Sequence, residues 1–203
     1  MINLSESGLR SRLHAVWVNE IDLWEESPSL HEDTDALAQR IARVFETRIG
    51  GQAHITEPAN YTNHFIVSIA VDGWSPSNRA LSNSTDFARS HGYSLWLEAL
   101  VSYYVPAVEI TWHVGGFEAN EYRQTVLDLA DVGAIDLPIA SRLEEMTLHL
   151  LDDLSEASIE RLELSVTSLL ADPSWPCPYP WPSAAPTAEG WRLRHYLFDA
   201  LSE

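Results

Sequence analysis

The chain has 203 residues, 45% of them hydrophobic, with eight tryptophans, seven tyrosines and five phenylalanines. Its 30 acidic and 12 basic residues give a formal net charge of −18. The aromatic content excludes a disordered acidic chain, no apolar run approaches the roughly 20 residues that span a bilayer, and the N-terminus lacks the pattern of a secretory signal.

All 12 basic residues are arginines, and lysine is absent. A GC-rich genome or resistance to a lysine-directed modification would each produce this composition. The negative charge repels phosphate backbones and anionic lipid, which argues against direct binding of DNA, RNA or membranes. It attracts a basic protein and speeds its association. The alternative is that the acidity serves solubility alone.

Motifs for cofactor or covalent chemistry are missing from the sequence. The single cysteine, Cys177, precludes an internal disulfide and a cysteine-based zinc site. A reducing, cytosolic location is therefore expected. There is no P-loop, no GxGxxG and no HExxH pattern, and no GxSxG nucleophile elbow. We therefore expect no cofactor.

The N-terminal quarter predicts two helices. Residues 4–17 carry apolar side chains at helical spacing, and residues 17–24 then alternate in the manner of a strand. Ser29 and Glu32 form a capping-box pattern ahead of a second, longer helix. That helix is expected to end at Gly50.

The next segment predicts two strands with a helix between them. Residues 64–72 and 108–114 alternate apolar and polar side chains and predict strands. Residues 74–92 are rich in serine and asparagine and predict a loop with at most one helical turn. Residues 93–104 are apolar all round, which favours a buried helix that stops before Pro106.

From residue 119 onward the apolar spacing is helical. Three helices are expected, over residues 122–129, 139–150 and 155–169. Alternating prolines over 173–182 then forbid a helix and favour an extended polyproline segment. A last helix is expected over about 187–201.

Together these elements predict an α+β fold. A small antiparallel sheet in the N-terminal half, packed with helices, would be followed by a helical C-terminal half and a proline-rich extended segment. The chain is expected to form one domain, 1–203. Its expected parts are a mixed α/β portion over 1–117, a helical portion over 118–172, an extended segment rich in proline and tryptophan over 173–186, and a C-terminal helix over 187–203.

Acidic residues concentrate in two segments with few basic residues. The first holds Glu20, Asp22, Glu25, Glu26, Glu32, Asp33 and Asp35, and the second holds Glu144, Glu145, Asp152, Asp153, Glu156, Glu160 and Glu163. On the helix predicted over 155–169, Glu156, Glu160 and Glu163 share one face, a spacing at which like charges cost helix stability. A basic partner would relieve that cost. The alternative is an ordinary solvated helix face.

Two other groups of residues provide weaker hypotheses. Trp74, in a loop, and Trp181, in the proline segment, are candidates for exposed interface anchors, although each can also pack over the domain's own edge. Glu145, His149 and Asp152 share a helix face at a spacing that can chelate a metal, but a surface histidine between two acids explains it as well. His64 and His113 lie on polar faces of predicted strands, where they would approach Glu109 if the strands pair. We assign neither a metal site nor a catalytic residue.

We therefore expect an acidic cytosolic inhibitor, not an enzyme, that neutralises a basic protein, as a bacterial immunity protein neutralises a toxin such as a nuclease. One alternative is an enzyme with a dispersed carboxylate and histidine site, with or without a metal. The other is a nucleic-acid mimic that blocks a DNA- or RNA-binding protein. The expected partner-binding residues are Glu20, Asp22, Glu25, Glu26, Asp33, Asp35, Glu144, Glu145, Asp152, Asp153, Glu156, Glu160, Glu163, Trp74 and Trp181.

Overall fold

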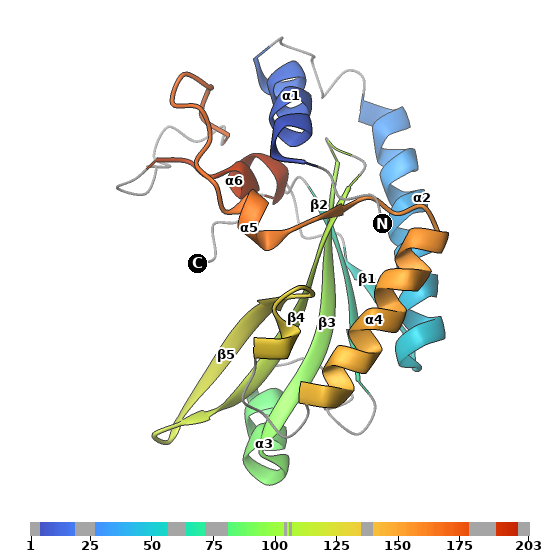
Figure 1. Cartoon of the computed structure of the whole chain (residues 1–203), viewed down its shortest axis with the longest axis vertical. Helices are drawn as coiled ribbons and strands as arrows, with labels where there is room; N and C mark the ends of the chain where they lie inside the picture. The colour runs from blue at the N-terminus through green and yellow to red at the C-terminus, as the bar shows by residue number, and fades with distance from the viewer. Residues whose placement is uncertain are drawn as a thin grey trace.

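The structure is a computed structural model that describes residues 5–18, 27–56, 64–71, 81–103, 105, 107–134, 140–178 and 190–198, with the backbone alone at 27–33, 81–84 and 134. A sheet runs through the middle of the molecule, with helices on either side of it (Figure 1). In the described part of the chain, no helix is long and apolar enough to cross a membrane.

The sheet has six strands and mixed pairing. Its strands are β1 (His54–Thr56), β2 (His64–Ala70), β3 (Tyr93–Ser102), β4 (Val108–Glu118), β5 (Glu121–Asp128) and β6 (Arg161–Leu162). The order β1-β2-β3-β4-β5 is antiparallel throughout, and β6 pairs in parallel with the start of β4. Consecutive antiparallel neighbours need only short connections, whereas β6 returns to β4 through a helix.

Two long helices cover one face of this sheet. They are α2 (Ser27–Ile49) and α4 (Ala140–Glu156), and they lie side by side on it (Figure 1). Their apolar stripes bury Ile41, Phe45 and Leu150 against alternate strand residues such as Leu97 and Trp112. Because Trp112 is fully buried, its indole N–H requires an acceptor, and it donates to the hydroxyl of Thr147 on α4 at 2.9 Å.

The opposite face of the sheet is covered at its two ends by shorter helices. At one end α1 (Glu6–Trp17) and α6 (Leu193–Phe198) form a second core with Leu100 and Trp175. At the other end α3 (Leu81–His91) packs on β3 and β4, where Arg89 lies over the ring of Phe117. Trp175, at the start of the proline-rich segment, thus packs against the body of the protein. Residues 179–189 lie outside the described residues.

The expected α+β fold is wrong, because the sheet is not confined to the N-terminal half. The segment over 93–104 is strand β3 and not a helix: it is the middle strand and is buried on both faces, so it lacks the alternation typical of a strand. The segment over 122–129 is strand β5, joined to β4 by a two-residue turn at Ala119 and Asn120 with positive φ at both. The sheet therefore continues well past residue 117.

Other boundaries also differ from the sequence prediction. The helix expected over 155–169 does not form, because α4 continues to Glu156 and Ser158 then takes a positive φ of 55°. Strand β6 and the single turn of α5 (Leu164–Thr167) follow instead. The loop expected over 74–92 contains α3, β1 was not predicted, and the last helix is the short α6.

Four of the predicted elements are confirmed closely. The first helix is α1, whose cap is Ser5. The second is α2, which begins at Ser27, so the Ser29 pattern lies inside the helix and not at its cap. The strands expected over 64–72 and 108–114 are β2 and β4. The strand expected over 17–24 falls mostly outside the described residues, and Trp17 itself belongs to α1.

Candidate functional site

The outer surface of α4 gathers unneutralised carboxylates around an exposed leucine. Leu143, Leu150 and Leu154 face the core, which turns the other side of the helix to solvent. That side carries Glu144, Glu145, Leu148, Asp152 and Glu156, all of them exposed, and we call these five residues the acidic α4 surface. Among the described residues, none of its four carboxylates forms an ion pair.

Leu148 is the most exposed large hydrophobic residue in the described part of the chain, at 65%. Glu144 and Glu145 lie one turn before it and Asp152 one turn after it, so these acids surround it on the helix surface. Single exposed leucines are common on protein surfaces. An apolar side chain ringed by charges has, however, the composition of a contact site, with a desolvated centre and a polar rim.

Three other acids of the second acidic segment form ion pairs within the protein. Asp153 accepts two bonds from Arg48 on α2, at 2.6 and 2.7 Å, and this pairing holds the pKa of Asp153 below its usual range. Glu160 accepts from Arg12 on α1 at 2.9 Å. Glu163 lies 3.7 Å from Arg161. The first two pairs join segments far apart in the sequence, whereas the third is local, and all three carboxylates have partners within the protein.

The helix face predicted for Glu156, Glu160 and Glu163 therefore does not exist. Only Glu156 lies on α4, while Glu160 precedes β6 and Glu163 caps α5. In the first acidic segment, Asp35 is exposed on α2. Asp33 also lies on α2, where the structure describes its backbone alone. Glu20, Asp22, Glu25, Glu26, Trp74 and Trp181 lie outside the described residues.

A second cluster of charged groups is buried beneath α5 and α6, on the sheet face that α2 and α4 leave uncovered. Glu109 of β4 is 1% exposed, and it accepts a 2.5 Å hydrogen bond from the hydroxyl of Thr167 and a 3.1 Å bond from Nε of Arg194. Burial raises the pKa of Glu109, against the opposing effects of Arg194 and Thr167. Both carboxylate oxygens are thus used to fasten α5 and α6 to the sheet.

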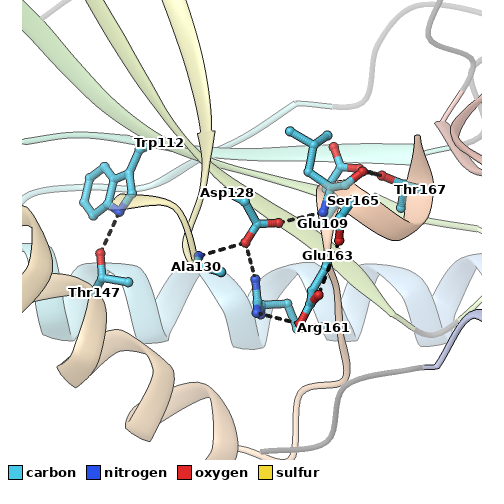
Figure 2. A network of polar contacts seen from close by, with 10 residues as sticks. Glu109, Trp112, Asp128, Ala130, Thr147, Arg161, Glu163, Ser165 and Thr167 are labelled. Carbon is cyan, nitrogen blue, oxygen red and sulfur yellow. Dashed lines mark hydrogen bonds and ion pairs between the residues drawn. The ribbon is translucent and has the colours of Figure 1, made fainter. Parts of the chain in front are cut away.

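Asp128 and Arg161 form a buried ion pair next to this cluster, as Figure 2 shows. Oδ1 of Asp128 accepts from Arg161 at 2.8 Å and from the backbone N–H of Ala130 at 2.9 Å, and Oδ2 accepts from the N–H of Leu164 at 2.6 Å. One carboxylate therefore joins the end of β5, the strand β6 and the first turn of α5.

His113 lies farther along β4 within a polar group of its own. Its Nε2 is 3.1 Å from the hydroxyl of Thr111 and 3.5 Å from the carboxylate of Glu98, and its Nδ1 is 2.7 Å from the amide nitrogen of Gln124. With that amide as donor, the neutral imidazole carries its proton on Nε2, directed at an oxygen. Both ring nitrogens are thereby engaged.

The two histidines and Glu109 share one sheet face, as the sequence suggested, but they do not form one site. His64 is on β2, separated from β4 by β3, and His113 is four residues from Glu109, which is about 13 Å along a strand. Desolvation lowers the pKa of His64 to about 4, partly offset by Glu98. In the described residues, its Nδ1 is buried without a hydrogen-bond partner.

The described residues contain no group of three histidine, cysteine or acidic side chains placed to hold a metal ion, so Glu145, His149 and Asp152 share α4 without forming such a site. Cys177 is exposed. Sequence reasoning missed Leu148, although its position follows from the helical wheel: it lies opposite Leu143, Leu150 and Leu154 once the helix is recognised.

Comparison with known proteins provides no relative for the chain: no family model, no curated protein and no solved structure matches it.

Proposed function

We propose that this protein is a cytoplasmic, non-enzymatic inhibitor that binds a basic protein and neutralises it, in the manner of a bacterial immunity protein that binds a toxin such as a nuclease. The observation that carries the proposal is the acidic α4 surface. It combines the exposed Leu148 with four exposed carboxylates that form no ion pair within the described part of the chain, whose net charge over its full sequence is −18.

The position of these acids on the helix supports a role in binding. Asp152 and Glu156 lie in the last turns of α4, where the helix dipole is negative and where no basic residue is present. Acidic side chains there cost stability, and so do like charges one turn apart. Arg48 forms hydrogen bonds with Asp153, and its charge also attracts Asp152. Lysine or arginine side chains of a partner would offset the remaining cost for Asp152 and the whole of it for Glu156.

The buried polar groups favour the inhibitor over the enzyme. Both carboxylate oxygens of Glu109 and of Asp128 are bonded to groups that hold α5, α6 and β6 in place. The nucleic-acid mimic is supported less, because the acids form one stripe from Glu145 to Glu156, about 16 Å along a helix, and not an extended array. Release of the partner by DNA or RNA would point to the mimic.

The test is capture of host proteins on the tagged full-length chain, followed by their identification. We expect a basic protein to be retained by the wild type and lost from Asp152→Lys/Glu156→Lys. The matched control is Glu46→Lys/Asp86→Lys, which makes the same change in net charge at exposed positions on α2 and α3. Equal loss from both variants would mean that the overall charge, and not the acidic α4 surface, holds the partner.

A further inference from the structure

The two edges of the sheet differ in how well they are closed to another strand. One edge is β1, which has only three residues and therefore offers few hydrogen bonds. The other is β5, whose eight residues pair with β4 without a break in register. An exposed edge of this length is what natural proteins usually shorten, bend or cover.

Half of the backbone groups of β5 point away from the sheet. The two-residue turn makes Glu118 and Glu121 a hydrogen-bonded pair, so every second residue from Glu121 onward bonds to β4. The N–H and C=O groups of Tyr122, Gln124 and Val126 consequently face outward. In the described part of the chain, no backbone hydrogen bond to these groups is formed from the outer side.

The middle of β5 lacks the usual devices against strand addition, and its exposed charges, Glu121 and Arg123, lie near the hairpin tip. It contains no proline and no bulge, and the stretch from Gln124 to Leu127 carries no charge. The β-branched Val126 is 41% exposed at the centre of that stretch. Such an edge would be expected to pair with a second copy of the chain, but two copies that each carry −18 repel one another.

The charges around β5 favour a basic occupant. Exposed acids lie at both ends of the edge, Glu118 and Glu121 at the hairpin tip and Asp131 beyond the strand. Glu118 and Glu121 face each other across the ladder, and only Arg123 lies between them, at 3.5 and 3.2 Å. Like charges directly opposite one another are unfavourable, and a lysine or arginine on an added strand would reduce that repulsion.

We propose that β5 is a docking edge for an extended, lysine- or arginine-bearing segment of a basic protein, which adds to the sheet as a further antiparallel or parallel strand. Main-chain hydrogen bonds to Tyr122, Gln124 and Val126 supply affinity, and the flanking acids supply the preference for a basic segment. This proposal rests on the proposed function in one respect, which is that the added strand belongs to a basic protein.

The test is an NMR titration of the ¹⁵N-labelled full chain with a synthetic peptide of alternating lysine and valine, equal in length to the eight residues of β5. We expect shifts and slowed amide exchange at Tyr122, Gln124 and Val126, whereas the amides of Arg123 and Thr125 already bond to β4. A peptide of alternating glutamate and valine should not bind. Shifts confined to α4, or none, would overturn the proposal.

Two variants test the edge directly. Val126→Pro removes one outward N–H and should weaken peptide binding by about tenfold or more. Val126→Thr keeps the N–H and the branched shape and should bind as the wild type does. Retained binding by Val126→Pro, in a chain whose other amide signals show the native fold, would overturn the proposal. Concentration-dependent shifts at β5 without peptide would also overturn it, in favour of a second copy.

The Asp152→Lys/Glu156→Lys chain separates this proposal from the proposed function. It should bind the peptide with unchanged shifts at β5 even though it fails to retain the partner from lysate. If the peptide shifts vanish in this variant, α4 holds the peptide and the edge proposal fails. If the peptide-induced shifts at β5 persist and the variant still retains the partner, the partner does not bind through the acidic α4 surface. The proposal for the β5 edge then stands.

Discussion

Asp128 and Arg161 form a 2.8 Å ion pair in which each side chain is only 4% exposed. The two residues come from the end of β5 and from β6, which are far apart in the sequence and meet at β4. The carboxylate also accepts two backbone N–H bonds, so both of its oxygens are hydrogen-bonded. This extra bonding is what makes a buried ion pair tolerable.

Removing one member of this pair should destabilise the protein severely. Arg161→Met leaves the carboxylate of Asp128 buried without its counter-charge, and such a loss costs about 3–5 kcal/mol. We expect the urea midpoint of unfolding to fall accordingly, with little change in the slope. Arg123→Met provides the control, since its pairs with Glu118 and Glu121 are exposed at the hairpin tip. Equal effects of the two substitutions would show that the Asp128 site is accessible to water.

His64 should make the stability of the fold depend on pH. Its pKa is about 4 in the folded protein, against an ordinary value of 6.5, so the unfolded chain binds a proton more readily. The stabilisation is complete above pH 6.5 and is lost as the pH falls toward 4, by a total on the order of 3 kcal/mol. The measurement is the free energy of unfolding over that pH range.

His64→Leu should flatten that part of the pH profile, because it removes the titrating group. It should cost little at neutral pH, because the buried Nδ1 that it removes has no hydrogen-bond partner within the described part of the chain. His149→Gln, at an exposed position on α4, should leave the profile as it is. A profile equally steep in His64→Leu would assign the acid sensitivity to other groups.

A glycine in the middle of β4 makes room for an aromatic side chain. A Cβ at Gly115 would meet Oη of Tyr122 and lie 2.6 Å from Oγ of Ser94, while these two oxygens are 3.2 Å apart. Gly115→Ala should therefore displace the Tyr122 ring and destabilise the hairpin by about 1–3 kcal/mol. In Gly115→Ala/Tyr122→Ala the clash with the tyrosine ring is absent and only the Ser94 hydroxyl has to move, so the two costs should be clearly less than additive. Additive costs would contradict this packing.

The long amphipathic helices and the alternating strands β2 and β4 were predictable from the sequence, whereas β3 and β5 were misread as helices for identifiable reasons. β3 is buried on both faces, so its apolar run resembles a buried helix, and only its length and neighbours distinguish the two. On β5, Tyr122 and Val126 are four residues apart, which imitates a helix stripe. The turn before it is formed by Ala119 and Asn120, and alanine rarely adopts the positive φ that it has here.

The candidate site was only partly predictable. The acids of the α4 surface stand out in the sequence, but the sequence could not separate them from Asp153, Glu160 and Glu163. Arg48 of α2 and Arg12 of α1 pair with Asp153 and Glu160, and only the tertiary fold brings these residues together. Glu163 pairs with Arg161, two residues before it in the sequence. Leu148 was missed because exposure depends on which helix face meets the core.

Substitutions on the acidic α4 surface should weaken partner binding without lowering the stability of the fold. Asp152→Lys/Glu156→Lys replaces two acids at the negative end of a helix with bases, so the melting temperature should be unchanged or raised. Leu148→Ala should likewise leave the fold intact, because the side chain is exposed, and should weaken partner binding by about tenfold or more. Thermal unfolding measures the first effect and titration calorimetry with the purified partner measures the second. A large loss of stability in either variant would show that α4 is held by contacts through this face.

The most direct test of the proposed inhibitor is the association rate with the purified partner, measured by stopped flow over a range of salt concentrations. For the wild type, the rate constant should be high and should fall steeply as salt rises, because opposite charges steer the encounter. For Asp152→Lys/Glu156→Lys, the rate constant should be lower and should vary much less with salt. A wild-type rate that is independent of salt, or equal in the two proteins, would contradict the proposal that the acidic α4 surface binds a basic partner.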